Sequence, residues 1–539
     1  MKKIIFLLLI NILLFSCARV GAPNGGTRDS LAPKFLGSNI DTTRLNVSRT
    51  VKELRLDFDE YVMLKDFNKN FNVSPPIKKI KKVIPSNLAN KYVLIQWEDT
   101  LQANTTYNFN FGNAIVDNNE SNPLPYFNFA FSTGDKIDDL FVSGTVKDAM
   151  TLIKENQTAK DNKMVVGLYK AGENLDYKQK PDYITKVDEE NYFELNFLPK
   201  GEFVIIAFDD ENQNSVYDAG KEKVSFLKEK ITLDSTSVRG LKLKLYPSKK
   251  VVKYKESKAI NGGLLMTFEG NPETVEVKSL SEELKDFKVT HAKRSDSVNI
   301  WFDAEKSNLG GTVSKQVKLS YFTPTISDTI SVSYKAVKDE FKLSNEAGNL
   351  IAPENNFVIN TSLPIENLNT SSWKLESDSI AQDFTAKISE KNPFKILVNS
   401  SFKPTKKYVL TIPKETVSSY YSSNDKSFQF QFEIDKPENY GSFTAVIKNK
   451  PTAKFWVELT NEKGEILYSQ FTNASEVSFK NLKPATYIAR IRVDNNGNGF
   501  WDEADFAQNI AAEDVYIFEK EINVRPLWEI KEDWELTNH

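Results

Sequence analysis

Two pairs of internal repeats constrain the fold of this chain more than any other feature. In the first pair, apolar and polar residues alternate along two segments, and both segments recur 301 positions later. The aligned apolar residues are Tyr107, Phe109 and Phe111 with Tyr408, Leu410 and Ile412, and Phe127, Phe129 and Phe131 with Phe428, Phe430 and Phe432. In the second pair, residues 197–218 match residues 481–502 without a gap, at an offset of 284. Such alternation is typical of strands with one buried face, so two types of β module each occur twice.

Length and composition agree with an all-β protein of several domains. The chain has 539 residues, which is several times the usual size of one domain. It contains 36 Phe and 20 Tyr but only 5 Met, and aromatic residues suit the half-buried face of a strand. We therefore expect tandem β-sandwich domains. The one segment with a helical pattern is residues 279–287, with a candidate cap at Ser279 and Glu282.

The first seventeen residues are predicted to be an export signal. Two lysines precede an apolar stretch, residues 4–15, which is too short to span a bilayer and is followed by Ser16 and Cys17. This resembles a bacterial lipoprotein signal, in which the cysteine is lipidated and becomes the first residue of the mature protein, although Phe15 is bulkier than usual. An ordinary N-terminal membrane anchor is the alternative. Cys17 is the only cysteine, so no internal disulfide forms, and residues 18–33 are expected to be a tether.

The segment that follows the cysteine suggests the type of the first domain. "CARVGAPNGGTRDSLAP" resembles the start of lipoproteins common in the Bacteroidetes, whose next module is a bacterial Ig-like domain of the type found in a surface-layer protein. "LRLDFDEYV" and "YFNFAFSTGD" agree with it, and the resemblance implies an Ig-like domain at residues 34–136. The repeat at offset 301 then predicts a second Ig-like domain at residues 341–436. Residues 250–338 are also β-patterned and are interpreted as a further Ig-like domain.

The second repeated module has a different character. "FVSGTVKD" and "FLPKGEFVIIAFDDENQNSVYD" resemble the small prealbumin-like or carboxypeptidase-regulatory-like sandwich. The resemblance implies one such module at residues 139–247 and another at residues 438–527. The second copy departs from the pattern because it lacks a counterpart of Gly144 in its first strand. Residues 528–539 are expected to be a C-terminal tail.

Each prealbumin-like module carries a loop rich in Asp and Asn. The repeated residues are Asp210, Asn212, Asn214 and Asp218 in the first loop and Asp494, Asn496, Asn498 and Asp502 in the second. Oxygen-bearing residues at positions 1, 3, 5 and 9 of a tight loop can surround a calcium ion, and relatives of this module carry such loops. Asp505 could supply a further carboxylate in the second loop, whereas the first has Lys221 there and Glu222 one place later.

The second loop is expected to be the better calcium site. Its position 6 is Gly499, whereas the first loop has Ser215 at a place where calcium loops usually bend at glycine. The alternative is that these residues only form turns, which Asp, Asn and Gly favour in any protein. A bound calcium ion would have a structural role, because it would hold a long loop in a chain without disulfides.

Several function classes are disfavoured by what the sequence lacks. The net charge of -3 and pI of about 5.9 provide no basic field for nucleic acid. Only two histidines occur, and His291 beside Ser295 and Asp296 is interpreted as a surface residue, because triad members meet through the fold. With Cys17 lipidated, no thiol nucleophile, zinc set or glycine-rich phosphate loop is found. A carboxylate-pair glycosidase is not excluded by counting, but no motif supports it.

The sequence therefore predicts a non-enzymatic outer-membrane lipoprotein with a structural or binding role in the cell envelope. The lipid anchor would hold it to the membrane. Its partner would be an envelope protein or a glycan, and the sequence does not distinguish between them. No acidic run follows Cys17, which favours the periplasmic face over the cell surface. The main alternative is a surface carbohydrate-binding accessory protein, for which Trp501, Trp528 and Trp534 are candidate residues, although a strand-end or core role is favoured for each of them.

Overall fold

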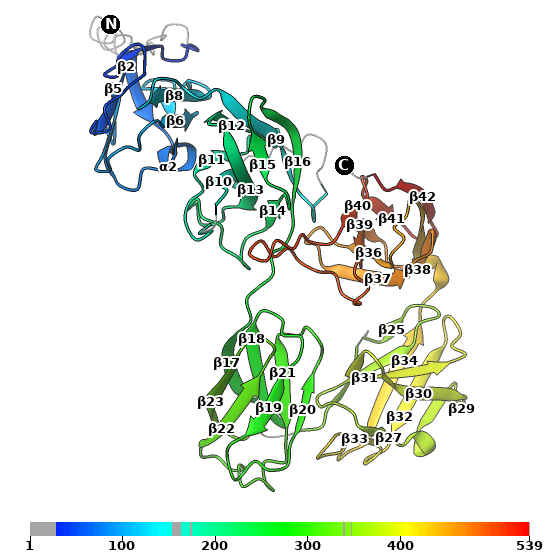
Figure 1. Cartoon of the computed structure of the whole chain (residues 1–539). Helices are drawn as coiled ribbons and strands as arrows, with labels where there is room; N and C mark the ends of the chain where they lie inside the picture. Colours follow the sequence, from blue (N-terminus) through cyan, green and yellow to red (C-terminus); the bar gives the residue numbers. More distant parts are fainter. Residues whose placement is uncertain (1–28, 153–162, 173–174, 338–339, 347, 538–539) are drawn as a thin grey trace, which may run out of the picture.

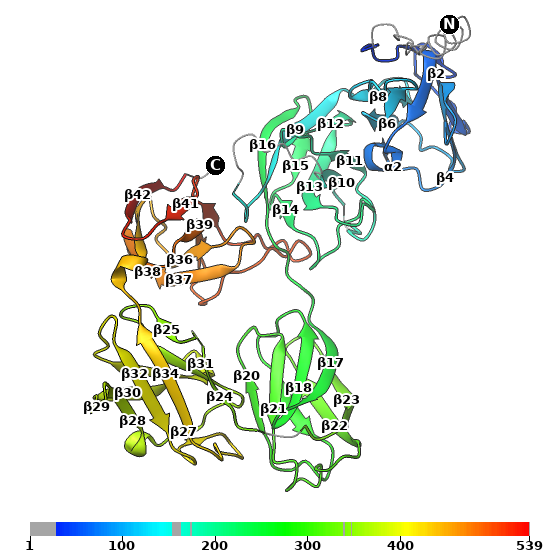
Figure 2. The same ribbon diagram turned by 180° about the vertical axis from the view of Figure 1, so that it is seen from behind.

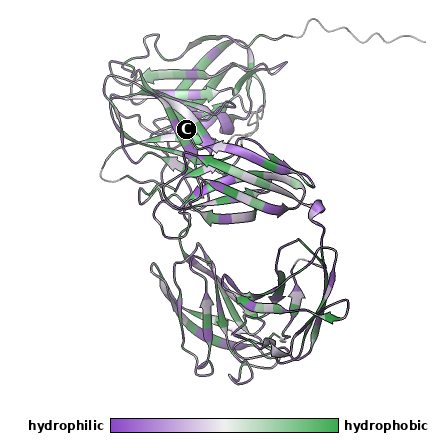
Figure 3. Cartoon of the chain, turned by 90° about the vertical axis from the view of Figure 1, so that its right-hand side faces the viewer, coloured by the Kyte–Doolittle hydropathy of each residue, from purple (hydrophilic) through white to green (hydrophobic). Residues whose placement is uncertain are grey.

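The computed structural model describes residues 29–152, 163–172, 175–337, 340–346 and 348–537. Within these residues the chain forms five successive β-sandwiches, which we number in chain order (Figure 1). Sandwiches 1 to 5 span residues 35–132, 140–245, 253–334, 343–434 and 441–535. Hydrophobic and hydrophilic residues alternate along their strands (Figure 3). The predicted all-β, tandem β-sandwich fold is confirmed. Cys17 lies outside the described residues.

Sandwiches 1 and 4 are the two copies of the repeat at offset 301. The elements of sandwich 1 are β1 (Phe35–Ser38), β2 (Glu53–Leu64), α2 (Phe67–Asn70), β3 (Asn72–Ser74), β4 (Ile80–Ile84), β5 (Asn90–Trp97), β6 (Thr106–Gly112), β7 (Ile115–Asp117) and β8 (Phe127–Ser132). Those of sandwich 4 are β24 (Leu343–Asn345), β25 (Leu350–Ile351), β26 (Phe357–Thr361), β27 (Asn367–Leu368), η1 (Thr370–Ser372), β28 (Lys374–Ser377), β29 (Ile380–Ala381), β30 (Phe384–Ser389), β31 (Asn392–Ser400), β32 (Lys407–Ile412), β33 (Val417–Ser418) and β34 (Phe428–Ile434).

The repeat at offset 301 preserves strand register and a tyrosine contact. Tyr107 of β6 is paired with Phe131 of β8, and Tyr408 of β32 is paired with Phe432 of β34. The Tyr107 hydroxyl accepts a hydrogen bond from the backbone N–H of Gln102, and the Tyr408 hydroxyl accepts one from that of Lys403, each at 2.8 Å. Most of the repeated apolar residues are buried in the two cores, as their alternation predicts, and Phe127, Phe428 and Phe430 pack against these cores while partly buried.

Sandwiches 2 and 5 are the two copies of the repeat at offset 284. Sandwich 2 contains β9 (Leu140–Asp148), β10 (Met164–Lys170), β11 (Tyr183–Lys186), β12 (Tyr192–Leu198), β13 (Gly201–Asp209), β14 (Val224–Phe226), β15 (Ile231–Leu233) and β16 (Val238–Leu245). After η2 (Pro437–Asn439), sandwich 5 contains β35 (Gly441–Lys448), β36 (Phe455–Thr460), β37 (Ile466–Thr472), β38 (Glu476–Leu482), β39 (Ala485–Val493), β40 (Val515–Ile517), β41 (Ile522–Val524) and β42 (Glu529–Glu535).

The topologies of sandwiches 2 and 5 agree strand for strand. One sheet has the order β11-β10-β13-β14 in sandwich 2 and β37-β36-β39-β40 in sandwich 5. The other has the order β12-β9-β16 and β38-β35-β42, in which β16 is parallel to β9 and β42 is parallel to β35. The prediction that residues 528–539 form a tail is wrong, because β42 belongs to this sheet and Trp534 is buried in the core. Interleaved charged residues along β42 concealed its apolar alternation.

Sandwich 3 packs a four-stranded sheet, β17-β18-β21-β20, against a three-stranded one, β19-β22-β23. Its strands are β17 (Lys253–Ile260), β18 (Gly263–Glu269), β19 (Glu276–Ser279), β20 (Lys288–His291), β21 (Ser297–Trp301), β22 (Lys315–Phe322) and β23 (Ser327–Tyr334). The predicted helix at residues 279–287 is wrong. Ser279 ends β19, its hydroxyl accepts from the backbone N–H of Ser281 in a turn, and Leu284 enters the core.

A hairpin from sandwich 5 inserts into sandwich 2. The connection from β39 to β40 is seven residues longer than that from β13 to β14, since 515 minus 493 is 22 and 224 minus 209 is 15. Residues 503–512 replace the three residues 219–221 of the first copy and form a hairpin, closed by a bridge between Asp505 and Ile510. At its base the backbone of Ala504 bonds with Pro247 and Lys249, directly after sandwich 2. The hairpin reaches sandwich 2 in both ribbon views (Figures 1 and 2).

Phe506 of this hairpin is the central apolar contact. Only 5% of its surface is exposed, and its ring centroid lies 4.4 Å from that of Tyr177 and 5.1 Å from that of Phe226. It completes an apolar cluster on the outer face of sandwich 2, opposite that domain's own core. The buried members of sandwich 2 are Val165, Tyr169, Ile184, Ile206, Phe208, Tyr217 and Val224. The hairpin therefore covers a face that would otherwise be an exposed apolar patch.

Other contacts link the sandwiches that lie between these two in the chain. Trp301 of sandwich 3 lies in the core cluster of sandwich 4, and its ring centroid is 5.9 Å from that of Phe394. Arg294 of sandwich 3 donates to Asp502 of sandwich 5 at 2.7 Å. Sandwiches 2, 3, 4 and 5 thus form a closed arrangement, and the Phe506 contact joins its two ends (Figure 1).

We predict that Phe506→Ala separates sandwich 5 from sandwich 2. Removing a buried phenylalanine side chain costs about 3–5 kcal/mol in a packed core, and this contact joins domains far apart in the chain. Small-angle X-ray scattering of the full chain should show a larger radius of gyration for the variant. Ile510→Ala is the matched control, because Ile510 lies in the same hairpin but is 51% exposed. Equal scattering by both variants would contradict the prediction.

Candidate functional site

The two Asp- and Asn-rich loops occupy equivalent places in the fold. The first follows β13 of sandwich 2, and the second follows β39 of sandwich 5. Asp210 and Asp494 come directly after these strands, and each has 3% of its surface exposed. Because the strands are central in equivalent sheets, both loops begin at the same end of the domain with the same orientation.

Hydrogen bonds within the two loops repeat residue for residue. The Asp210 carboxylate accepts from the backbone N–H groups of Asn214 and Ser215, both at 3.0 Å. The Asp494 carboxylate accepts from those of Asn498 and Gly499, also at 3.0 Å. The side-chain oxygens at positions 3 and 5 accept from backbone N–H groups in both loops. The sequence repeat therefore corresponds to a repeated three-dimensional arrangement.

Position 9 of each loop accepts hydrogen bonds from the Asn side chains. The Asn212 amide donates to Asp218 at 2.6 Å in the first loop. In the second loop, the amides of Asn496 and Asn498 donate to the same oxygen of Asp502, at 2.5 Å and 2.7 Å. Hydrogen bonds therefore link the four predicted residues within each loop, although only the second loop has both Asn amides on the position 9 carboxylate.

A glutamate completes each cluster. Glu222 accepts from the backbone N–H groups of Glu211 and Asp218, at 3.0 Å and 2.9 Å. Glu513 accepts from those of Asn496 and Asp502, at 3.1 Å and 2.9 Å. Glu513 lies 291 positions after Glu222, which is the repeat offset of 284 plus the seven residues added by the hairpin.

The structure places Asp505 apart from the second loop. Its backbone N–H donates to the carbonyl of Ile510 inside the hairpin, and its carboxylate accepts from the backbone N–H of Gln508. Sequence spacing alone pointed to Asp505 because the hairpin moves Glu513 eleven positions beyond Asp502. If the seven additional residues are left out of the alignment of the two copies, Glu513 aligns with Glu222 at the offset of 284. The sequence could therefore have identified Glu513.

Burial and charge shift the pKa values of the loop carboxylates. Burial, together with repulsion from the nearby carboxylates of Asp210 and Asp218, raises the pKa of Glu222 to about 7. Burial also raises the pKa of Glu513, with a contribution from Asp502. For Asp502 burial acts in the same direction, but hydrogen bonds from Asn496, Asn498 and Arg294 outweigh it and lower the pKa. Negative charge is therefore concentrated in each cluster.

Arg294 of sandwich 3 contributes a positive charge to the second cluster. It reaches this cluster because the fold brings sandwich 3 next to sandwich 5. Its guanidinium donates to Asp502 at 2.7 Å, bonds with Glu273, and lies 4.6 Å from the centre of the Phe500 ring. A cation that used Asp502 would have to share this carboxylate with Arg294. This contact opposes cation binding in the loop that the sequence ranked as the better calcium site.

The chemistry of the side chains is compatible with calcium. Each cluster offers carboxylate oxygens from two Asp and one Glu and amide oxygens from two Asn, and calcium takes such oxygen ligands. Within the described residues, however, no group of three or more His, Cys, Asp and Glu side chains is placed to hold a metal ion. Asp494 and Glu513 already accept backbone hydrogen bonds, as a turn would require. Calcium in these loops therefore remains a prediction.

The other candidate residues do not form a common site. Trp534 is a core residue, whereas Trp528 is 48% exposed with Arg525 over its ring. Trp501 donates from Nε1 to the carbonyl of Glu513 at 3.1 Å. No ring contact joins any two of these tryptophans in the described part of the chain. The His291 Nε2 atom lies 3.0 Å from the carbonyl oxygen of Ser295, not from its hydroxyl.

Comparison with known proteins assigns one of the domains. Residues 29–133, which include sandwich 1, match the bacterial Ig-like domain family. No curated protein matches the chain. With the sheets described above, the chain is a protein of tandem β-sandwich domains, one of which matches this family. In the described part of the chain, no helix has the length and apolar character to cross a membrane.

Several solved structures resemble the chain at low identity. The S-layer protein rSbsC is 11% identical, with a TM-score of 0.15 over 92% of this chain and 67% of that one. The Bacteroides ovatus mixed-linkage glucan utilization locus protein SGBP-B is 10% identical, with a TM-score of 0.20 over 72% and 95%. The Bacillus cereus major pilin subunit BcpA is 11% identical, with a TM-score of 0.13 over 74% and 99%. At these TM-scores nothing about function follows.

We predict that calcium raises the melting temperature of the full chain relative to EDTA. A ligand that binds only the folded state stabilises it by RT ln(1 + [L]/Kd), about 2.7 kcal/mol at a concentration of about 100 times Kd. Asp210→Ala combined with Asp494→Ala should remove the calcium-dependent shift, because both position 1 carboxylates are lost. Asp505→Ala is the matched control and should keep the shift. Equal melting of the unmodified chain in calcium and EDTA would show that the loops are only turns.

Proposed function

We propose that this chain is a non-enzymatic lipoprotein of the bacterial outer membrane with a structural or binding role in the cell envelope. The observation that carries the proposal is the docking of the hairpin at residues 503–512 onto sandwich 2, which joins sandwiches 2 to 5 into one body. A rigid set of β-sandwiches behind an N-terminal tether suits the presentation of binding surfaces at a fixed distance from a membrane.

The arrangement of polar residues supports a non-catalytic role. A Ser-His-Asp triad needs the histidine to contact the serine hydroxyl, whereas His291 faces a backbone carbonyl and the Ser295 hydroxyl donates to the carbonyl of Ser297. A glycosidase needs two carboxylates facing an open cleft. The cavity of about 320 Å³ between sandwiches 4 and 5 has no Asp or Glu among its lining residues. Neither enzyme class is supported by these sites.

We further propose the membrane attachment and its orientation. Lipid on Cys17 would anchor the mature chain, with residues 18–33 as the tether. The absence of an acidic run after Cys17 favours the periplasmic face of the outer membrane over the cell surface. The partner would be an envelope protein or a glycan. Calcium, when bound, would have a structural role in the loops after β13 and β39, where Asp210 and Asp494 already organise the backbone.

The anchor leads to a direct prediction. Metabolic labelling with a fatty-acid analogue should label the unmodified chain but not Cys17→Ser, because the thiol is the only group that could carry the lipid in this signal. The variant should also run on gels as the unprocessed precursor. Ser16→Ala retains the cysteine and should remain labelled. Equal labelling of the unmodified chain and Cys17→Ser would contradict the lipoprotein assignment.

A further inference from the structure

The junctions between sandwiches 1 and 2 and between sandwiches 4 and 5 are equivalent places in the duplicated chain. In each, an Ig-type sandwich meets two edge strands of the next domain, β11 and β12 in the first case and β37 and β38 in the second. Register identifies the counterparts, because Leu168 pairs with Tyr183 and Leu459, 291 positions later, pairs with Tyr468. The two junctions can therefore be compared residue by residue.

The first junction is closed and the second is open. The cavity at the first junction is about 10 Å³, and the backbone N–H of Ile184 there donates to the Ser74 hydroxyl of sandwich 1. The cavity at the second junction is about 320 Å³, within the range of about 300–1,000 Å³ typical of small-ligand sites. The position equivalent to Ile184 is Ser469, so a smaller and polar side chain lines the open cavity.

The charge of the junction also differs between the copies. The first junction includes Glu194 and no lysine. The second includes Lys480 and Lys483 and no acidic residue, and the offset of 284 aligns these lysines with Asn196 and Pro199. Among the described residues, neither lysine forms a salt bridge. The open junction therefore carries a local positive charge that its closed counterpart lacks, in a chain whose net charge is -3.

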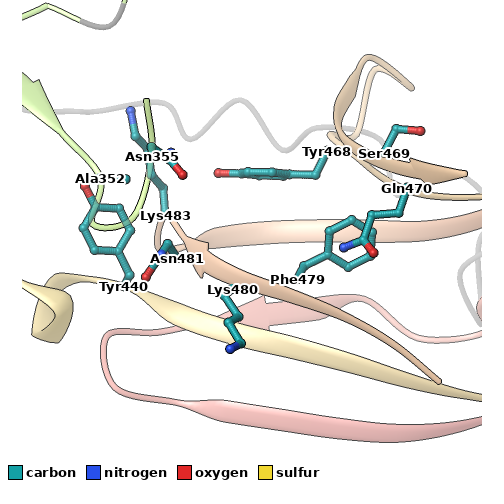
Figure 4. Close-up of a pocket in the computed structure, with 10 residues that line it drawn as sticks. All are labelled: Ala352, Asn355, Tyr440, Tyr468, Ser469, Gln470, Phe479, Lys480, Asn481 and Lys483. Carbon is teal, nitrogen blue, oxygen red and sulfur yellow. The ribbon is translucent and has the colours of Figure 1, made fainter. Parts of the chain in front are cut away.

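The walls of the open cavity combine aromatic rings with amide groups (Figure 4). The ring of Tyr468 from β37 is partly exposed, whereas Tyr440 from the linker and Phe479 from β38, which also line the cavity, are only 7% and 4% exposed. The amides belong to Asn355, Gln470 and Asn481, and the Asn481 amide donates to the carbonyl of Pro353 at 2.8 Å, which fixes sandwich 4 against sandwich 5. Rings of this kind pack against the C–H face of a sugar, and amides bond with hydroxyl groups.

We propose that the junction between sandwiches 4 and 5 binds an acidic saccharide. The ammonium groups of Lys480 and Lys483 attract its carboxylate, and the ring of Tyr468 and the amides hold its sugar rings. A neutral sugar would leave the lysines without a partner, and a small inorganic anion would leave most of the cavity unfilled. This inference rests on the binding role proposed above, but it requires neither the lipid anchor nor calcium in the loops.

The test is a calorimetric titration of the full chain in EDTA with digalacturonate and diglucuronate. Saturable binding of at least one is expected, with the corresponding neutral disaccharides, galactobiose and cellobiose, bound about tenfold more weakly or not at all. Lys480→Asn, which restores the residue of the first copy, and Lys483→Met should each weaken binding several-fold. Binding should also weaken as salt is added, because the attraction is between charges near the surface.

Lys531→Met is the matched control. It removes the same charge from sandwich 5, but Lys531 pairs with Glu476 and does not line the cavity. Its affinity for the acidic disaccharide should equal that of the unmodified chain.

Ser469→Trp should abolish binding by filling the cavity, and its melting temperature shows whether the domain remains folded. Absence of binding to both acidic disaccharides, equal affinity for neutral ones, or full affinity in the Lys480→Asn, Lys483→Met double variant would overturn the proposal. The labelling of Cys17 is unaffected by any of these outcomes.

Discussion

The insertion of Phe506 into the outer face of sandwich 2 is the contact on which the arrangement of the other domains depends. Sandwich 2 buries one apolar cluster between its sheets and carries a second on the opposite face of the β10–β13 sheet. Without the hairpin that second cluster would be an apolar patch in water. With the hairpin in place, the segment that follows sandwich 2 and the hairpin of sandwich 5 are held next to each other, although about 250 residues separate them in the chain. Trp301 then joins sandwich 3 to sandwich 4, and Arg294 joins sandwich 3 to sandwich 5.

Duplication followed by divergence explains why only one copy needs this cover. Ile206 and Phe208 of sandwich 2 correspond to Arg490 and Arg492 of sandwich 5 at the offset of 284. In sandwich 5 both guanidinium groups bond with Glu458, which is itself buried. A buried ion pair costs desolvation, but its partners satisfy each other without another domain. The two copies therefore have complementary properties, since one provides the apolar face and the other provides the hairpin that fills it.

Patterns between neighbouring residues in the sequence predicted the paired strands and the loop residues of this structure. The aromatic alternation at offset 301 predicted paired strands with buried rings, and the structure pairs Tyr107 with Phe131 and Tyr408 with Phe432. The positions of loop residues such as Asp494 also followed from the repeat. Arg294 could not be predicted, because it lies 208 residues from Asp502 and reaches it only through domain packing. Glu513 was missed because the hairpin interrupts the repeat between Asp502 and its partner.

Electrostatic repulsion within the two loops is offset in different ways, and the difference bears on calcium. Each cluster brings two Asp carboxylates and one Glu carboxylate together at a buried strand end. In the first loop the pKa of Glu222 rises to about 7, so a bound proton removes part of the charge near neutral pH. In the second loop Arg294 neutralises Asp502 directly. Calcium in the first loop would therefore displace a proton, whereas calcium in the second would compete with a guanidinium that also positions sandwich 3. Binding at the second loop would thus be coupled to the contact between sandwiches 3 and 5.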